Sequence, residues 1–186
     1  VQLFTEIVEY MSRNPGKIQK TFGEVYSDLR EFIDLSHRDG SIKTKVLADP
    51  GQYLGRDKHV PEMLHKLVES GKKIFLLTNS LFDYTDVVMS YCLDNAITEL
   101  PNWRDYFEHI FVGAGKPGFF DGSQPFYEVV DASGLLRVHS GPFKPGTIYQ
   151  GGNAHLFQKL TEQKGDEILY CGDHIYTDII RSKELF

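Results

Sequence analysis

Residues 167–178 read Glu-Ile-Leu-Tyr-Cys-Gly-Asp-His-Ile-Tyr-Thr-Asp. The apolar run at 168–171 is short and bounded by a glycine, which predicts a buried strand. Two carboxylates, Asp173 and Asp178, follow that glycine. Ligands of an open parallel sheet bind beyond the carboxyl ends of its strands, and Mg²⁺ binds one or two carboxylates together with water and phosphate. The stretch therefore predicts a Mg²⁺ site, and the alternative is a simple turn followed by a helix cap.

Composition restricts the class of protein. The chain has 186 residues, 41% hydrophobic and 13% aromatic, as expected for a globular protein with one sizeable core. Its net charge of −6 argues against binding to a nucleic-acid polymer. Neither a signal peptide nor a bilayer-spanning apolar run is visible in the sequence, so we expect a soluble, cytoplasmic protein with no membrane partner. Cys92 and Cys171 lie in apolar surroundings and are expected to be reduced core residues.

The first part of the chain is predicted to be helical. Residues 2–12 carry an amphipathic pattern, and Thr21 with Glu24 forms a capping box that opens a second helix. The buried side of this second helix is expected to consist of apolar residues at helical spacing. They are Val25, Leu29, Phe32 and Ile33.

A polar stripe lies on another face of the same predicted helix. Arg30, Asp34 and His37 are spaced by four and three residues and therefore share one side. Lys43 follows in a short helix that Pro50 ends. Taken alone, these residues favour a solvated face with an Arg30–Asp34 pair.

The remainder of the chain alternates predicted strands and helices. This order is typical of an α/β protein, so we expect a Rossmann-like parallel sheet in a core at 59–186, preceded by a helical segment at 1–58. The main strands and helices are expected at residues 73–77, 84–93, 106–112, 153–163 and 168–171.

A hairpin is expected inside this core. Two β-prone runs, 126–130 and 135–139, flank the turn-forming sequence Asp131-Ala132-Ser133-Gly134.

Three segments could act together on a phosphate group. Thr78-Asn79-Ser80 offers hydroxyl and backbone N–H groups just before a helix, which suits phosphate oxygens. Lys116 supplies a compact positive charge for a phosphoryl group. Each signal is weak alone, because such residues usually form caps and loops. Their order before Asp173 and Asp178 predicts a site for phosphate chemistry.

The chain resembles the haloacid dehalogenase superfamily of phosphatases at these motifs. More closely, it is similar to the cytosolic purine 5′-nucleotidases that are selective for inosine and guanosine monophosphates (IMP and GMP). The resemblance covers roughly residues 22–186 and rests on five segments. They are residues 75–80, 84–86, 116–120, 148–152 and 169–183.

The resemblance implies a Mg²⁺-dependent hydrolase of purine nucleoside monophosphates with an incomplete haloacid dehalogenase core. Lys116 would steady the phosphoryl group, Asp173 would ligate Mg²⁺, and Asp178 would be a ligand or a partner of the ligands. The expected phosphate contacts are Thr78, Asn79 and Ser80.

The same resemblance implies a function for the polar stripe, because the matching residues of these nucleotidases line the nucleotide pocket. Arg30 and Asp34 would meet acceptor and donor atoms of the purine edge. His37 would stack on the ring, and Lys43 would reach anionic oxygens.

A second lysine competes for the phosphate role. Lys144 also precedes a proline and a helix, and its distance from Asp173 suits a generic superfamily member. Because the predicted hairpin explains the longer gap as an insertion, we favour Lys116.

The nucleophile of the superfamily is the first aspartate of an Asp-x-Asp-x-Thr segment, which becomes an aspartyl phosphate. Residues 1–186 contain no such segment. We therefore expect a fragment of a longer nucleotidase, inactive alone, whose nucleophile lies outside this chain. Another small-molecule phosphatase of the superfamily and an inactive nucleotide-binding or regulatory homologue stay open. Relatives often form oligomers, so a homo-oligomer is a further expectation.

Overall fold

The computed structural model describes residues 1–131 and 134–183. The chain divides into two compact units between Asp49 and Pro50, and each is described by itself. The functional division predicted after residue 58 stays a prediction.

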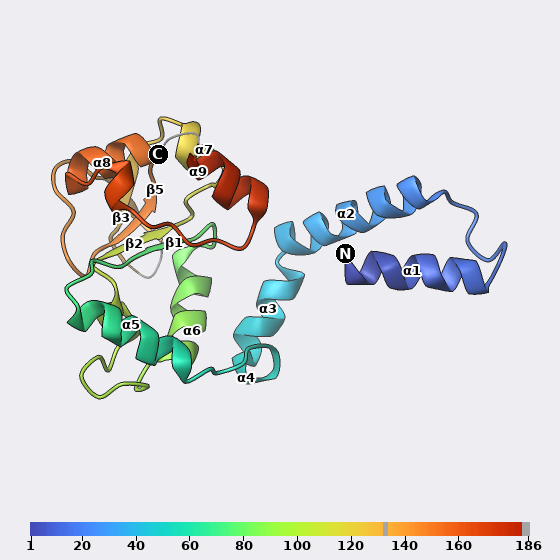
Figure 1. Ribbon diagram of the computed structural model, residues 1–186, viewed down its shortest axis with the longest axis horizontal. Coiled ribbons are helices and arrows are strands. Elements are labelled where there is room, and N and C mark those ends of the chain that lie inside the picture. The colour runs from blue at the N-terminus through green and yellow to red at the C-terminus, as the bar shows by residue number, and fades with distance from the viewer. Residues whose placement is uncertain (132–133, 184–186) are drawn as a thin grey trace. The chain divides into compact units, whose positions relative to one another are not determined.

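The first unit consists of helices (Figure 1). The predicted capping box is confirmed: the Thr21 hydroxyl accepts the Glu24 N–H, and the Glu24 carboxylate accepts the Thr21 N–H. Phe4 and Tyr26 pack edge to face, with ring centroids 5.7 Å apart. The helices are α1 (Gln2–Arg13), α2 (Phe22–Arg38) and α3 (Ser41–Ala48).

The expected buried side of α2 is only partly correct. Val25 is buried, whereas Phe32 and Ile33 are 64% and 40% exposed. Helical spacing places these side chains along one stripe, but the stripe is buried only where another element packs on it.

The second unit is built on one mixed sheet. Within residues 1–131 and 134–183, five strands pair in the order β1-β2-β5-β3-β4. β1, β2 and β5 run parallel to one another, whereas β3 runs antiparallel to both of its neighbours, β5 and β4. The strands are β1 (Phe75–Leu77), β2 (His109–Val112), β3 (Phe126–Val129), β4 (Leu136–Val138) and β5 (Ile148–Gly151).

The α/β class is confirmed, but the sheet is not purely parallel. The predicted hairpin forms as β3 and β4, and it joins the parallel strands through β5. Two residues of the expected turn, Ala132 and Ser133, lie outside the described residues.

Helices cover both faces of the sheet, α5 and α6 on one and α7 and α8 on the other (Figure 1). The remaining elements are α4 (Pro50–Tyr53), α5 (His59–Glu69), α6 (Phe82–Leu93), η1 (Trp103–Tyr106), α7 (Gly118–Asp121), α8 (Ala154–Thr161), η2 (Gly165–Glu167), the π-helix η3 (Ile175–Ile180) and α9 (Arg181–Lys183).

Side chains of β2 show why both faces need cover. Phe111 packs with Phe157 of α8 on one face, whereas Ile110 and Val112 pack with Leu93 of α6 on the other. A strand that is apolar on both sides is typical of a sheet sandwiched between helices.

The predicted strand at 168–171 was wrong. Ile168 and Tyr170 pack on the cluster around Phe111, while Leu169 is 85% exposed. The segment therefore alternates as a strand does, yet no ladder of the described sheet includes it. Cys171 is exposed and so is not a core residue; its thiol, like that of the partly buried Cys92, is free.

Candidate active site

The loops that follow β1 and β2 lie side by side. Both strands run in parallel, so their carboxyl ends share one edge of the sheet. The Gly113 N–H donates to the Ser80 carbonyl at 2.7 Å, and the Ala114 N–H donates to the Thr78 carbonyl at 3.0 Å. These backbone bonds join the predicted phosphate loop to the loop that carries Lys116.

Asn79 holds the backbone of Lys116. Its side-chain Nδ2–H donates to the Lys116 carbonyl at 3.0 Å, and its Oδ1 accepts the Lys116 N–H at 2.6 Å. The Thr78 hydroxyl oxygen accepts the Ser80 N–H at 3.1 Å. Two residues expected to contact phosphate thus also shape the loop, and their contacts with phosphate stay a prediction.

The side chains of Lys116, Tyr170 and Asp178 form a closed ring of hydrogen bonds. Lys116 Nζ lies 2.8 Å from the Tyr170 hydroxyl and 3.0 Å from Asp178 Oδ1. The Tyr170 hydroxyl donates to the same Oδ1 at 3.0 Å. The Lys116 and Asp178 side chains are only 13% and 4% exposed, so water screens their attraction weakly.

The charges of this ring are well defined. Burial alone would lower the pKa of Lys116, but the hydrogen bonds to Tyr170 and Asp178 outweigh it and raise that pKa. Burial alone would raise the pKa of Asp178, but the bonds from Lys116 and the His174 N–H lower it. The pKa of Tyr170 is raised by burial and by Asp178. Near neutral pH the ring therefore holds an ammonium, a neutral phenol and a carboxylate.

These shifts predict how pH changes the stability that the pair contributes. The lowered pKa of Asp178 makes its contribution complete above about 3.9, the value of an unfolded aspartate, and lost as pH falls through the folded pKa. The raised pKa of Lys116 makes its contribution complete below about 10.4 and lost as pH rises through the folded pKa.

The measurement is the difference in free energy of unfolding between the unaltered protein and the double variant Lys116→Met/Asp178→Asn. Urea titrations should give a constant difference between roughly pH 5 and 9 and a decline on either side. A constant difference down to about pH 3 would contradict the lowered pKa of Asp178.

Asp178 owes its position to the local backbone. Its Oδ2 accepts the His174 N–H at 3.2 Å, and His174 caps the π-helix η3. Such helices are rare and are frequent at functional sites. Gly172 provides the space, since a Cβ there would lie 2.4 Å from the Asp178 Cβ.

Asp173 is the carboxylate that would hold Mg²⁺ in this site, and this role stays a prediction. This carboxylate is exposed, whereas both oxygens of Asp178 already accept hydrogen bonds from the protein. In the described part of the chain no three His, Cys, Asp or Glu side chains are grouped as a metal cage. Mg²⁺ is commonly held by one or two carboxylates plus water and phosphate, so Asp173 would be its main protein ligand here. The expectation that Asp178 also ligates the ion stays a prediction.

The predicted nucleotide-pocket residues lie in the first unit. Arg30 Nη2 and Asp34 Oδ2 are 3.9 Å apart on the exposed surface of α2. The His37 Nδ1–H donates to the Ile33 carbonyl at 2.8 Å, and Lys43 of α3 is half-buried. Because the Lys116 ring belongs to the second unit, their common role in one pocket stays a prediction.

The competing lysine has a different environment. The Lys144 side chain is exposed, and its backbone N–H donates to the Tyr149 hydroxyl at 2.8 Å. Tyr170, by contrast, was not anticipated as a site residue. Its place in the apolar run at 168–171 could have indicated that its ring is in the core, but nothing in the sequence indicates that its hydroxyl reaches Lys116.

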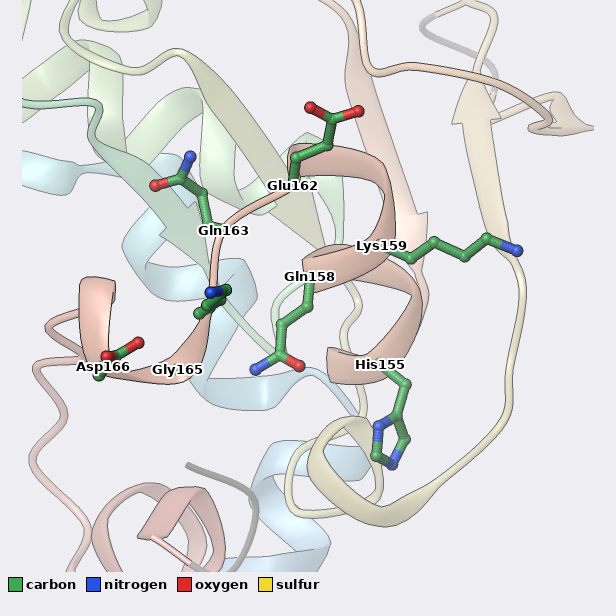
Figure 2. Close-up of a pocket in the computed structure, with 8 residues that line it drawn as sticks. His155, Gln158, Lys159, Glu162, Gln163, Gly165 and Asp166 are labelled. Atoms are coloured by element: carbon green, nitrogen blue, oxygen red, sulfur yellow. The ribbon is translucent and has the colours of Figure 1, made fainter.

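A polar depression of about 680 Å³ lies elsewhere, on α8 and the turn that follows it (Figure 2). It is lined by the basic residues His155, Lys159 and Lys164 together with the acidic Glu162 and Asp166. This mixture of charges shows no preference for an anion, and none of the predicted site residues lines it. We therefore place the candidate site at the Lys116 ring.

Comparison with known proteins shows the family of this chain. The sequence profile of the 5′-nucleotidase family matches residues 1–186. The chain belongs to the 5′-nucleotidase family. This finding confirms the family predicted from the motifs, and the α/β core is consistent with the haloacid dehalogenase superfamily. Since the match runs through both units, the N-terminal helices are part of the family's sequence.

One relative is human 5′-nucleotidase domain-containing protein 2. It is 33% identical over 156 residues, which make up 83% of this chain and 29% of the relative. The chain thus spans less than a third of that relative's length. Among residues 1–131 and 134–183, no helix is both long and apolar enough to cross a membrane.

Proposed function

We propose that the protein containing this chain is a 5′-nucleotidase that hydrolyses purine nucleoside monophosphates, IMP and GMP, to nucleoside and phosphate. The observation that carries the proposal is the Lys116–Asp178 pair, 3.0 Å apart, which adjoins the Thr78–Ser80 loop in a chain of this family. The reaction would belong to purine metabolism in the cytoplasm.

In the proposed chemistry Lys116, Asp173 and the 78–80 loop supply charge and position, and none of them forms a covalent bond to the substrate. Phosphoryl transfer is catalysed mainly by holding the group in line and by stabilising its oxygens. The Lys116 ammonium and the N–H groups of the 78–80 loop would bind those oxygens. Mg²⁺, held by Asp173, would neutralise further phosphate charge when bound.

The covalent step would use a carboxylate outside residues 1–186. That carboxylate would attack phosphorus as the nucleoside oxygen leaves, and water would then hydrolyse the aspartyl phosphate to free phosphate. Asp178 would not be this nucleophile, because it is buried and bonded to Lys116, Tyr170 and the His174 N–H.

The full-length protein tests the proposal when it is assayed with Mg²⁺ on a panel of nucleoside monophosphates and sugar phosphates. Preferred release of phosphate from IMP and GMP is the expected result. Faster hydrolysis of sugar phosphates would favour another phosphatase of the superfamily. Binding of IMP by calorimetry without hydrolysis of any ester would favour a regulatory homologue.

In this proposal purine selectivity arises from the polar stripe of α2. Arg30→Ala and Asp34→Ala should each raise KM for IMP about tenfold or more, because a good polar contact is worth roughly 1–3 kcal/mol. The KM for a small generic phosphate ester should barely change. Glu31→Ala, at an exposed neighbour on the same helix, is the control. Equal effects on both substrates would show that the stripe is structural.

A further inference from the structure

We infer that Tyr170 is a positioning residue, whose hydroxyl fixes the Lys116 ammonium for binding a phosphoryl group. The inference rests on the proposed function and extends it to a residue outside the motif positions predicted to contact substrate. It starts from the ring of hydrogen bonds, in which the Tyr170 hydroxyl accepts from Lys116 at 2.8 Å and donates to Asp178 at 3.0 Å.

The position of the Tyr170 hydroxyl follows from the packing of its ring. Tyr170 stacks on Phe75 of β1, with centroids 6.5 Å apart and planes at 13°. It also meets Phe120 of α7 edge to face at 5.5 Å. Aromatic pairs in a packed core fix the position of a ring. The hydroxyl therefore has a location set by the sheet and α7.

Lys116 needs such an anchor. Lysine ends in a flexible four-carbon stem that loses rotamer entropy when it is fixed. Asn79 fixes only the Lys116 backbone. Tyr170 and Asp178 provide two acceptors for Nζ, and two acceptors together define where the ammonium sits.

The same arrangement directs the remaining donor. An ammonium has three N–H groups, and the bonds to Tyr170 and Asp178 use two of them. Among residues 1–131 and 134–183 no other group is hydrogen-bonded to Nζ, so the third N–H is left for an anion. Without the hydroxyl, Lys116 would turn toward the charged Asp178 alone and bind phosphate from a less defined position.

A double-mutant cycle on the full-length protein tests this coupling. Its members are the unaltered protein, Tyr170→Phe, Lys116→Met and the double variant, and the measured quantity is the Kd of inorganic phosphate by calorimetry. Tyr170→Phe keeps the ring and should weaken binding on the order of tenfold, the effect of losing one hydrogen bond to a charged group. Adding Tyr170→Phe to Lys116→Met should change the Kd by less than about twofold.

Tyr149→Phe is the matched control. Tyr149 is fully buried and its hydroxyl also accepts one hydrogen bond, from the Lys144 N–H, so it reports a generic loss of a buried phenol oxygen. It should leave the Kd unchanged. The inference is overturned if Tyr170→Phe has no effect, if its effect is the same without Lys116, or if the unaltered protein does not bind phosphate. If the cycle behaves as expected but IMP is not hydrolysed, the positioning role stands and the proposed reaction fails.

Discussion

Replacing Asp173 with asparagine is expected to lower Mg²⁺-dependent hydrolysis of IMP by the full-length protein on the order of a hundredfold or more. The neutral amide keeps the shape of the side chain but removes the charge that attracts a divalent cation. The measurements are kcat over a range of Mg²⁺ concentrations and, independently of turnover, the Mg²⁺ affinity by calorimetry. Both should fall together.

Asp166→Asn is the control for this variant, because Asp166 is also exposed and lies on η2, which contributes no side chain to the ring of Lys116, Tyr170 and Asp178. It should leave kcat and Mg²⁺ affinity unchanged. Near-normal turnover and metal binding by Asp173→Asn would remove Asp173 from the site.

Gly172→Ala should damage both the fold and the site. The added Cβ would lie 2.4, 2.6 and 2.8 Å from Cβ, Cγ and Oδ2 of Asp178. Asp178 would have to shift away from Lys116 and the His174 N–H. Overpacking of this kind costs about 1–3 kcal/mol, so we expect a destabilisation in that range and a loss of IMP hydrolysis.

Gly55→Ala separates this steric effect from a general response to alanine. Nothing lies within 4 Å of a Cβ at Gly55. The free energy of unfolding of Gly55→Ala should therefore stay within about 0.5 kcal/mol of that of the unaltered protein. Urea denaturation measures both variants. Equal stabilities of the two would show that the backbone near Gly172 yields easily and that the close approach is unimportant.

The sequence predicted those elements whose pattern is local. The run before Thr78 predicted β1, and the Thr21–Glu24 box predicted the start of α2. β5 was missed because Gln150 and Gly151 interrupt its short apolar run. Residues 168–171 have the composition of a strand, but strand formation needs a hydrogen-bonded neighbour. The described sheet gives this segment none.

The same distinction holds for the site. Residue types and their order pointed to Lys116 and Asp178, which the structure brings together. The hydrogen bond between Lys116 and Tyr170 joins side chains 54 positions apart. The hydrogen bonds between the Asn79 side chain and the Lys116 backbone join residues 37 positions apart. Contacts at such sequence separations depend on how the strands pair, so no local sequence pattern predicts them.

The bonds between the loops after β1 and β2 also have a consequence for motion. Amide protons exchange with solvent when their hydrogen bonds open, and neighbouring bonds that share a framework open as one unit. The amides of Gly113 and Ala114 are bonded to carbonyls of Ser80 and Thr78, and the Asn79 side chain clasps the next stretch of the same loop. These bonds would have to break before either loop could move alone. We therefore expect the two loops to stay bonded to each other during substrate entry and product release. If this edge of the sheet moves, the 78–80 loop and Lys116 should move together.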